Sequence, residues 1–386
     1  MNSNERHELR YQRRKAKRDL KKQERAEKFG DYEKVFTFAN LYKAYKSCCR
    51  GVGWKASTQR YKANALINVV ETLDLLLEGK FKTKGFYEFD IVERGKPRHI
   101  KSVHISERVV QRCLCDNSLV PTFSNSFIYD NGACMKGKGI DFAADRFSSH
   151  LRSYWRKYRT NEGYVLTFDF SKYFDNINHE KLKAIIARYY ADERLRTLLC
   201  KLVDDFGGES GLGLGSQISQ VSALMYPNVL DHFAKEVLRI KYYGRYMDDG
   251  YLVHRDKGYL KTCLTRIREL CDALEIKLNE KKTQIAKLSN GVTFLKRKFY
   301  LTDNGAVIRK PSRKGITKHR QKLKKFKRRL DEGKMSLEDI RTSHVSYKGH
   351  IKHCNAYRTA RSLDNRYYQL FIKGAKKENE RPKDNR

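Results

Sequence analysis

The sequence predicts an α+β protein that works on a polyanion. Helix-like and strand-like stretches mix irregularly between about residues 80 and 300, unlike the regular alternation that builds a doubly wound parallel sheet. The 386 residues are 40% hydrophobic and 12% aromatic, which is enough for a sizeable core. Lys and Arg (82) exceed Asp and Glu (45) by 37, and a surface this basic attracts nucleic acid. Simple solubility and an anionic membrane surface are the alternative explanations of the charge.

The composition argues against several other classes. No apolar run approaches the roughly 18 residues that a membrane span requires. Residues 1–30 are charged throughout and lack the apolar centre of a secretory signal. The nine cysteines contain no Cys-x-x-Cys pair, so zinc ribbons and thioredoxin-like sites are unsupported. We therefore expect a cytoplasmic protein with free thiols and no membrane partner.

The N-terminal part is expected to be mainly helical. Residues 1–28 carry eleven Lys and Arg against five Asp and Glu, so residues 1–32 form a basic arm, either helical or disordered. The arm either contacts phosphates or is a solvated tail. The expected elements that follow are helices over 36–45 and 65–76, a strand at 86–92, a basic turn at 94–98 and a helix over 105–120.

The central part is richer in strands, and a basic helical part follows it. The expected central elements are a strand at 164–170, a helix capped by Asn178, a glycine-rich loop at 207–215, a helix over 230–238, strands at 242–247 and 251–254, a helix over 264–278 and a strand at 292–300. A helix at 313–330 has a narrow apolar stripe, and its other faces are nearly all Lys and Arg. Residues 376–386 are expected to be disordered.

Three carboxylates are predicted to meet at strand ends of one sheet. Asp169 ends an apolar strand, and Asp248 and Asp249 are expected at the turn of a hairpin. An Asp-Asp pair alone is common in ordinary turns. Converging like charges need a counter-charge, and Mg²⁺ binds carboxylates together with substrate phosphates. Two such ions can activate an attacking hydroxyl and stabilise the leaving oxygen of a phosphoryl displacement.

The motifs around these acids resemble those of reverse transcriptases. The segments 168–174 (Phe-Asp-Phe-Ser-Lys-Tyr-Phe) and 246–249 (Tyr-Met-Asp-Asp) are similar to the two acidic palm motifs, and further motifs follow in order over roughly residues 36–370. The resemblance implies a right-hand polymerase with an antiparallel palm sheet. Its expected parts are fingers at 33–160, interleaved with the palm, a palm at 161–300 and a helical basic thumb at 301–375.

The resemblance also implies which residues form the catalytic and metal site. Asp169, Asp248 and Asp249 are the expected catalytic residues, and they hold two Mg²⁺ ions that Mn²⁺ can replace. The backbone carbonyl of Phe170 completes one metal shell in this family. No endonuclease module, RNase H acid set or zinc-finger tail is expected.

The expected nucleotide site contains several further residues. Phe174 falls at the family's sugar-gate position, where a bulky ring favours deoxynucleotides, and Lys172 and Tyr173 flank it; an ordinary core phenylalanine is the alternative. In the family's signature Gln-Gly-x-x-x-Ser-Gln, this chain has Leu214 in place of the first glutamine, followed by Gly215 and, at the end, Gln220. Diversity-generating and some defence-associated reverse transcriptases carry an aliphatic residue at that position. The loss of a polar contact there predicts reduced fidelity.

Cations for the triphosphate are expected mainly from the fingers. In the segment 96–100 Arg98 is the preferred ligand, followed by Lys96 or Lys101; each could instead be a solvated loop cation. The segment 134–140 is similar to a second fingers motif, with Met-Lys where many relatives have Arg-Pro. Lys282 is expected to protonate the departing pyrophosphate.

Primer and template contacts are expected from the end of the palm and from the thumb. The segment Phe294, Leu295 and Lys296 resembles the primer grip, with lysine where glycine is common. The basic helix at 313–329 is expected to hold the template–primer duplex by its phosphates, and a solvated face is the alternative. The expected contacts there are Lys322, Lys325 and Arg328. The segment 346–355 resembles the closing thumb motif, and no zinc site is expected at its His350, His353 and Cys354.

These expectations define one main function and two alternatives. The main prediction is an RNA-directed DNA polymerase that copies a structured RNA in a bacterial or phage retroelement or an antiphage defence system. A dedicated non-coding RNA, the DNA product and, in a diversity-generating system, an accessory protein are the expected partners. The first alternative is an RNA-binding chaperone or scaffold on the same fold. The second, an RNA polymerase, is disfavoured by Phe174. The priming mechanism and the oligomeric state are left open.

Overall fold

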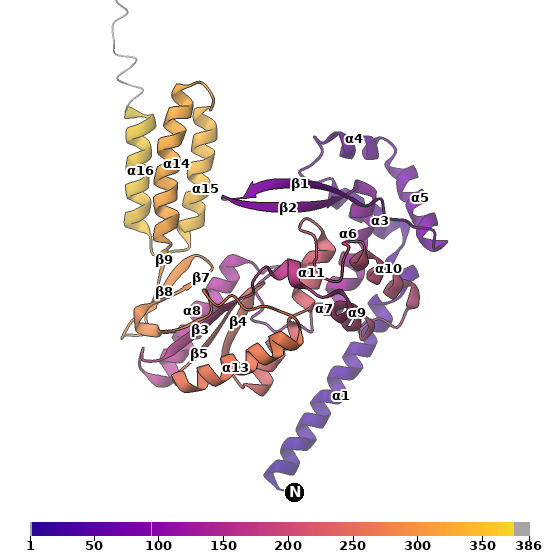
Figure 1. The fold of residues 1–386 in the computed structure, drawn as a ribbon, viewed down its shortest axis with the longest axis horizontal. Coiled ribbons are helices and arrows are strands. Elements are labelled where there is room, and N and C mark those ends of the chain that lie inside the picture. Colours follow the sequence, from indigo (N-terminus) through magenta and orange to yellow (C-terminus); the bar gives the residue numbers. More distant parts are fainter. Residues whose placement is uncertain (1, 94, 374–386) are drawn as a thin grey trace, which may run out of the picture.

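The computed structural model describes residues 2–93 and 95–373, and Figure 1 shows their arrangement. Helices surround a central antiparallel sheet, so the predicted α+β class is confirmed. The predicted disordered segment 376–386 lies outside the described residues. No helix in the described ranges is both long enough and apolar enough to span a membrane.

The N-terminal part consists of helices and one long hairpin. Its first helices are α1 (Ser3–Phe29), α2 (Tyr32–Val35), α3 (Phe38–Cys48), α4 (Ala56–Ala63) and α5 (Ala65–Leu77). The hairpin is formed by β1 (Phe86–Glu93) and β2 (Lys96–Val103). The helices after it are α6 (Ile105–Leu114), the π-helical η1 (Cys115–Leu119), α7 (Val120–Phe123) and α8 (Ile140–Tyr158). The basic arm is therefore a helix rather than a disordered segment.

The central sheet has the strand order β4-β5-β3-β6. Its strands are β3 (Tyr164–Asp169), β4 (Tyr242–Tyr246), β5 (Asp249–His254) and β6 (Gln284–Lys287). The helical elements between and beside these strands are η2 (Tyr173–Asn176), α9 (His179–Ala187), α10 (Glu193–Asp204), α11 (Gln217–Met225), α12 (Asn228–His232), η3 (Phe233–Val237) and α13 (Lys257–Ala273). All pairings in the sheet are antiparallel.

A small sheet connects the central part to a C-terminal bundle of three helices (Figure 1). A short η4 (Leu288–Asn290) precedes the sheet, whose strands are β7 (Val292–Phe294), β8 (Arg297–Leu301) and β9 (Val307–Pro311). The bundle consists of α14 (Arg313–Asp331), α15 (Leu337–Lys352) and α16 (Tyr357–Phe371). Inside it, His319 and His344 are buried and their ring nitrogens lie 3.1 Å apart, so part of the bundle core is polar.

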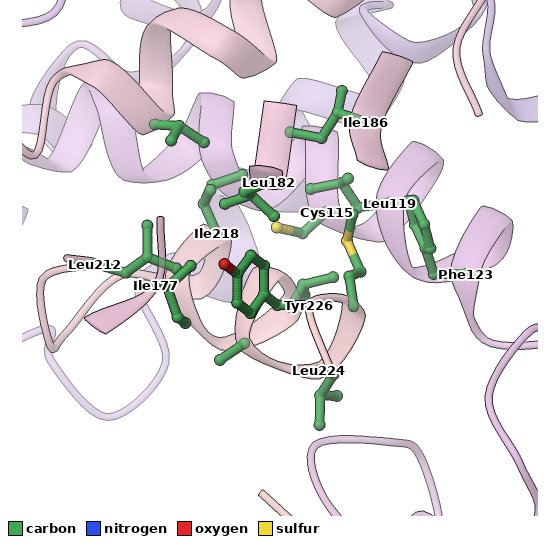
Figure 2. Close-up of a cluster of buried hydrophobic side chains, with 14 of the residues drawn as sticks. Cys115, Leu119, Phe123, Ile177, Leu182, Ile186, Leu212, Ile218, Leu224 and Tyr226 are labelled. Atoms are coloured by element: carbon green, nitrogen blue, oxygen red, sulfur yellow. The ribbon is translucent and has the colours of Figure 1, made fainter. Parts of the chain in front are cut away.

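One large apolar core joins the N-terminal helices to the central sheet. In Figure 2, side chains from η1 and α7 meet side chains from α9 and α11 around the buried ring of Tyr226. The labelled members are Cys115, Leu119, Phe123, Ile177, Leu182, Ile186, Leu212, Ile218 and Leu224. A continuous core makes these segments one packed body, on which the central sheet is rigidly held.

Several predicted elements differ in extent from the observed ones. The single strand expected at 292–300 is a hairpin, because Leu295 and Lys296 both adopt left-handed backbone angles, with φ of 49° and 62°. The basic turn expected at 94–98 is shorter, since β2 already begins at Lys96. The helix expected at 264–278 starts earlier, after the capping residue Asp256, and ends before Glu275, whose φ is 57°.

Gly250 provides a test of packing in the central sheet. A methyl group at this position would overlap the ring of Phe168, which is 1% exposed and cannot move away cheaply. We expect Gly250→Ala to lower the free energy of unfolding by about 1–3 kcal/mol, measured by chemical denaturation. Gly349→Ala is the matched control, because nothing lies within 4 Å of an added methyl on this exposed helical glycine. The control is expected to stabilise by about 0.5–1 kcal/mol, and equal effects of the two variants would contradict the packing argument.

Candidate active site

Strand register brings two of the three predicted acids directly together. Asp169, the last residue of β3, is paired with Asp249, the first residue of β5. Asp249 is therefore a strand residue, and the turn expected at Asp248 and Asp249 is formed by Met247 and Asp248 instead. The backbone N–H of Phe170 donates to the carbonyl of Asp248 at 3.2 Å, which ties the turn to the end of β3.

A buried ion pair stabilises this turn. The guanidinium of Arg245 on β4 lies 2.6–2.7 Å from both carboxylate oxygens of Asp231 on α12, and both side chains are 0% exposed. The same guanidinium donates to the carbonyl of Met247 at 2.8 Å. Met247 has a φ of 53°, an uncommon angle for a residue with a side chain. Arg245 therefore stabilises the turn conformation that presents Asp248.

Two of the three acids, Asp248 and Asp249, have raised pKa values. Burial raises the pKa of Asp248, and the nearby Asp169 raises it further. Burial also raises the pKa of Asp249 well above its usual range, with further contributions from Asp248 and Asp169. Both shifts mean that the surrounding protein supplies too little positive charge and too few hydrogen bonds to offset the burial of the ionised carboxylates.

One lysine supplies part of the missing counter-charge. The Nζ atom of Lys282 lies 2.6 Å from Oδ1 of Asp169, and the side-chain amide of Asn279 donates to Oδ2 at 3.2 Å. The backbone N–H of Asn279 also donates to the carbonyl of Asp169, at 2.7 Å. Asp169 is thus held by a segment about 110 residues further along the chain.

The donor set suits a hard divalent cation. Carboxylate oxygens are the ligands that Mg²⁺ prefers, and the raised pKa values of Asp248 and Asp249 show that a cation is electrostatically favoured there. Within residues 2–93 and 95–373, no group of three or more His, Cys, Asp or Glu side chains is arranged to hold a metal ion. This also applies to His350, His353 and Cys354. The ammonium of Lys282 lies where it competes with a cation for Asp169.

The glycine-rich loop is in contact with the hairpin β1–β2. Gly215 has a φ of 113°, and a side chain there would come within 3.2–3.3 Å of Ile100 and of the Lys101 carbonyl. The N–H of Lys101 donates to the carbonyl of Leu214 at 3.1 Å. This position therefore requires glycine on both conformational and spatial grounds. Gln220 is exposed on α11.

The residues after Asp169 separate into buried and accessible ones. Tyr173 is buried, and its hydroxyl donates to the carbonyl of Ala223 at 2.7 Å, so its side chain is not free to contact a nucleotide as expected. Phe174 is half-buried and packs edge-on against Tyr173, with ring centroids 5.8 Å apart. Lys172 is exposed and has a φ of 43°. Tyr173 thus supports Phe174 from beneath.

The expected triphosphate cations of the hairpin are paired with acids of β1. Arg98 lies 2.9 Å from a carboxylate oxygen of Glu93, and Lys101 lies 3.6 Å from Glu88. Lys101 also donates to the carbonyl of Phe206 at 2.8 Å. The side chain of Lys96 lies outside the described part of the chain. A polyanionic ligand that recruits Arg98 must exchange an existing ion pair.

The expected primer and template residues fall into two groups. Phe294 is 3% exposed and packs against Tyr251, so its ring belongs to the core and cannot contact a primer as expected. Leu295 is half-buried and Lys296 exposed at the left-handed bend that follows. On α14, Lys325 and Arg328 are exposed, whereas the ammonium of Lys322 already donates to Ser343 at 2.9 Å.

Sequence reasoning missed three residues that hold the site, namely Arg245, Asp231 and Asn279. A signal for the first was present, because Arg245 interrupts an otherwise apolar strand and a charge buried in a strand needs a partner. Asp231 and Asn279 carry no such signal, since nothing in a single sequence connects them to Arg245 or Asp169.

Comparison with known protein families assigns the chain to one of them. The model of the family "Reverse transcriptase (RNA-dependent DNA polymerase)" matches residues 82–299, which is 218 of the 386 residues. The chain belongs to this family, and the predicted family resemblance and right-hand polymerase fold class are confirmed. Enzymes of this family generally use divalent metal ions, typically Mg²⁺. No curated protein matches the chain.

Solved structures of telomerase are among those similar to the chain. The apo telomerase of Candida tropicalis is 14% identical, with a TM-score of 0.45, and the match covers 58% of this chain and 48% of that one. The telomerase of Candida albicans, in complex with a fragment of telomeric RNA, is 11% identical, with a TM-score of 0.46, over 77% of this chain and 61% of that one. The chain thus spans about half to three fifths of these relatives.

Neutralising Asp249 should stabilise the metal-free protein. Because the pKa of Asp249 is raised in the folded state, its ionisation weakens folding progressively as the pH rises above the unfolded value near 4. We expect Asp249→Asn to raise the free energy of unfolding by about 1–3 kcal/mol at pH 7, with a smaller gain at pH 4. Chemical denaturation in EDTA at both pH values measures this. Asp303→Asn, at an exposed turn, is the control, and a gain of equal size at both pH values would contradict the electrostatic cause.

Breaking the buried ion pair should cost more than replacing it. Arg245→Met leaves the buried charge of Asp231 without its partner, and we expect a loss of about 3–5 kcal/mol of unfolding free energy. The double variant Asp231→Leu/Arg245→Met removes both charges, so it should recover much of that loss. Denaturation of the single and double variants measures the coupling. Additive losses in the double variant would show that the two residues do not act as a pair.

Proposed function

We propose that the chain is an RNA-directed DNA polymerase that joins deoxynucleotides by metal-assisted phosphoryl transfer. The observation that carries this proposal is the pairing of Asp169 with Asp249 across β3 and β5, with Asp248 at the adjoining turn. The family match over residues 82–299 supports the same reaction. All three acids of the family's catalytic motifs are present in this chain.

Asp169, Asp248 and Asp249, together with the carbonyl of Phe170, are the residues proposed to hold two Mg²⁺ ions. Bound there, the ions would supply charge neutralisation for the attacking hydroxyl and the departing pyrophosphate. The protein contributes the oxygen ligands; Arg245 holds the turn that bears Asp248, and Asn279 holds Asp169. Lys282, whose Nζ atom lies 2.6 Å from Asp169, is the residue proposed to give a proton to the leaving group.

The loop at Gly215 and the ring of Phe174 form the proposed floor for the incoming nucleotide. Gly215 permits close backbone approach, and Phe174 is half-buried and packs against Tyr173. A ring at this place would clash with a ribose 2′-hydroxyl and so favour deoxynucleotides. Arg98 is the proposed triphosphate ligand, released from Glu93 by the stronger negative charge of the substrate.

The proposed division of the chain follows the right-hand polymerase plan. Residues 33–160 are the fingers, residues 161–300 the palm and residues 301–375 the thumb, after a basic arm at 1–32. Lys296 at the bend after β7 and Lys325 and Arg328 on α14 are exposed cations that suit primer and template phosphates.

For the biological setting we propose two classes of system. The aliphatic residue at position 214 and the motif at 134–140 favour a bacterial or phage retroelement of the diversity-generating kind or an antiphage defence system. A dedicated structured RNA is the proposed template, and an accessory protein is a proposed partner in the first of these settings. The cytoplasmic location stays a prediction.

The test of the function is deoxynucleotide incorporation by the purified protein on a primed RNA template with Mg²⁺. We expect incorporation by the parent chain and a loss of at least about 1,000-fold in Asp248→Asn, because the carboxylate supports the transition state directly. A parallel reaction with ribonucleotides measures sugar selection, and equal rates would overturn the proposed role of Phe174 and favour an RNA polymerase.

Binding of the same RNA provides the control. Asp248→Asn should keep the affinity of the parent, since the charge that attracts RNA lies elsewhere. Retained RNA binding with no incorporation by the parent, even with its native RNA, would overturn the polymerase and favour the scaffold alternative. Incorporation that survives in Asp248→Asn would exclude this site as its source.

A further inference from the structure

The helix α1 is attached to the protein only at its C-terminal end. Its last turn packs near α7 and η1, and the described side chains from Asn2 to Glu24 are all exposed. Figure 1 shows it leaving the body and running away from the β1–β2 hairpin and the C-terminal bundle. Segments that lie far apart in projection are far apart in space, so α1 lies apart from that hairpin and from the bundle.

One face of α1 carries a row of free cations. Residues three or four positions apart share a helix face, and Arg10, Arg13, Lys17 and Lys21 follow this spacing. All four are exposed, and none forms an ion pair with the side chains that the structure describes. The row is about 16 Å long at 1.5 Å per residue, which spans several phosphates of a nucleic acid strand. We name these four residues the basic row.

The acidic residues of the helix lie mostly on other faces. Glu8, Asp19 and Glu27 are turned away from the basic row by the 100° step per residue. Glu24 shares its face but lies one turn closer to the body than Lys21. Basic residues also occur on the acidic side of the helix, at Lys15 and Lys22, so the basic row is distinguished by having no acid between Arg10 and Lys21 on its own face.

The chemistry of α1 favours a double-stranded nucleic acid over other anionic partners. A membrane-surface helix or a helix that docks on a protein needs an apolar face. The exposed large apolar residues of α1 are Leu9 and Leu20, which lie eleven positions apart and form no stripe. Single-stranded binding relies on several aromatic side chains on which successive bases stack, whereas the sequence of α1 has only two Tyr or Phe residues, Tyr11 and Phe29, eighteen positions apart. What remains is sequence-independent contact with the phosphates of a duplex.

We propose that the basic row of α1 binds a base-paired segment of the RNA outside the catalytic cleft. The proposal rests on the proposed function, because a structured template is the molecule that extends beyond the cleft. The helix is preorganised for this role by its capping box, in which Asn2 and Glu5 exchange hydrogen bonds of 2.8 Å. An RNA held by α1 is tethered to the enzyme whatever part of it occupies the catalytic site.

The test compares two matched pairs of lysines on exposed helix surfaces. Lys17→Gln/Lys21→Gln removes two charges from the basic row, and Lys257→Gln/Lys261→Gln removes two charges of the same spacing from α13. Binding of a fluorescent blunt 20-base-pair RNA duplex to the full chain is measured by anisotropy over a series of salt concentrations. We expect the first variant to lower the slope of log affinity against log salt by about 1.8, or about 0.9 per lost phosphate contact. The second variant should leave the slope of the parent unchanged.

Two further variants complete the experiment. Arg10→Gln/Arg13→Gln/Lys17→Gln/Lys21→Gln should weaken duplex binding at least about tenfold at low salt. Arg10→Lys/Arg13→Lys should bind like the parent, because point charges suffice for phosphate contacts. Circular dichroism of each variant checks that α1 stays helical, which glutamine permits.

Primer extension separates this proposal from the proposed function. On a short primed template with no other duplex, the variants of the basic row should incorporate deoxynucleotides within about twofold of the parent, because α1 lies far from the site. Unchanged duplex binding in the four-residue variant, or an equal loss in the α13 control, would overturn the proposal. Failure of the parent to extend any primer would count against the function while leaving the binding result intact.

Discussion

The site depends on the burial of one positive charge. Arg245 carries its guanidinium into the core of a strand, where Asp231 neutralises it, and the spare N–H group reaches the turn that bears Asp248. A buried charge tolerates only the arrangement in which its partner is present. A slip of β4 by one residue would turn Arg245 to the opposite face of the sheet. The ion pair therefore fixes the strand register as well as the turn.

The charge distribution of the molecule is uneven. A chain with a net charge of +37 gathers three acids at one strand end, and it supplies them with a single close lysine. Elsewhere the cations expected to bind substrate are held by acids of β1. Each of these pairs can be exchanged for a stronger ionic partner. This under-compensated charge lowers stability, as is common where function requires it.

The sequence predicted the fold class, most elements and the three acids, because periodicity and strand-end position are local properties. It failed where backbone conformation departs from the pattern. The residue types do not indicate that Leu295 and Lys296 adopt left-handed backbone angles, so the sequence predicted one strand at 292–300 where the structure has a hairpin. It also failed on burial, since the aromatic side chains of Tyr173 and Phe294 suit either a core or a ligand. The packing partners that decide between these are distant in the chain.

The hairpin β1–β2 contacts the loop at Leu214 near its base, so a small rotation at the base produces a larger displacement at its tip. The strand β2 extends about 23 Å from Val103 to Lys96, and near its fixed end Lys101 is bonded to Leu214. A rotation of about 10° at the base would sweep the tip through roughly 4 Å over that length, compared with about 1 Å at Lys101. Small movements at the contact with Leu214 are therefore magnified at the tip of the hairpin.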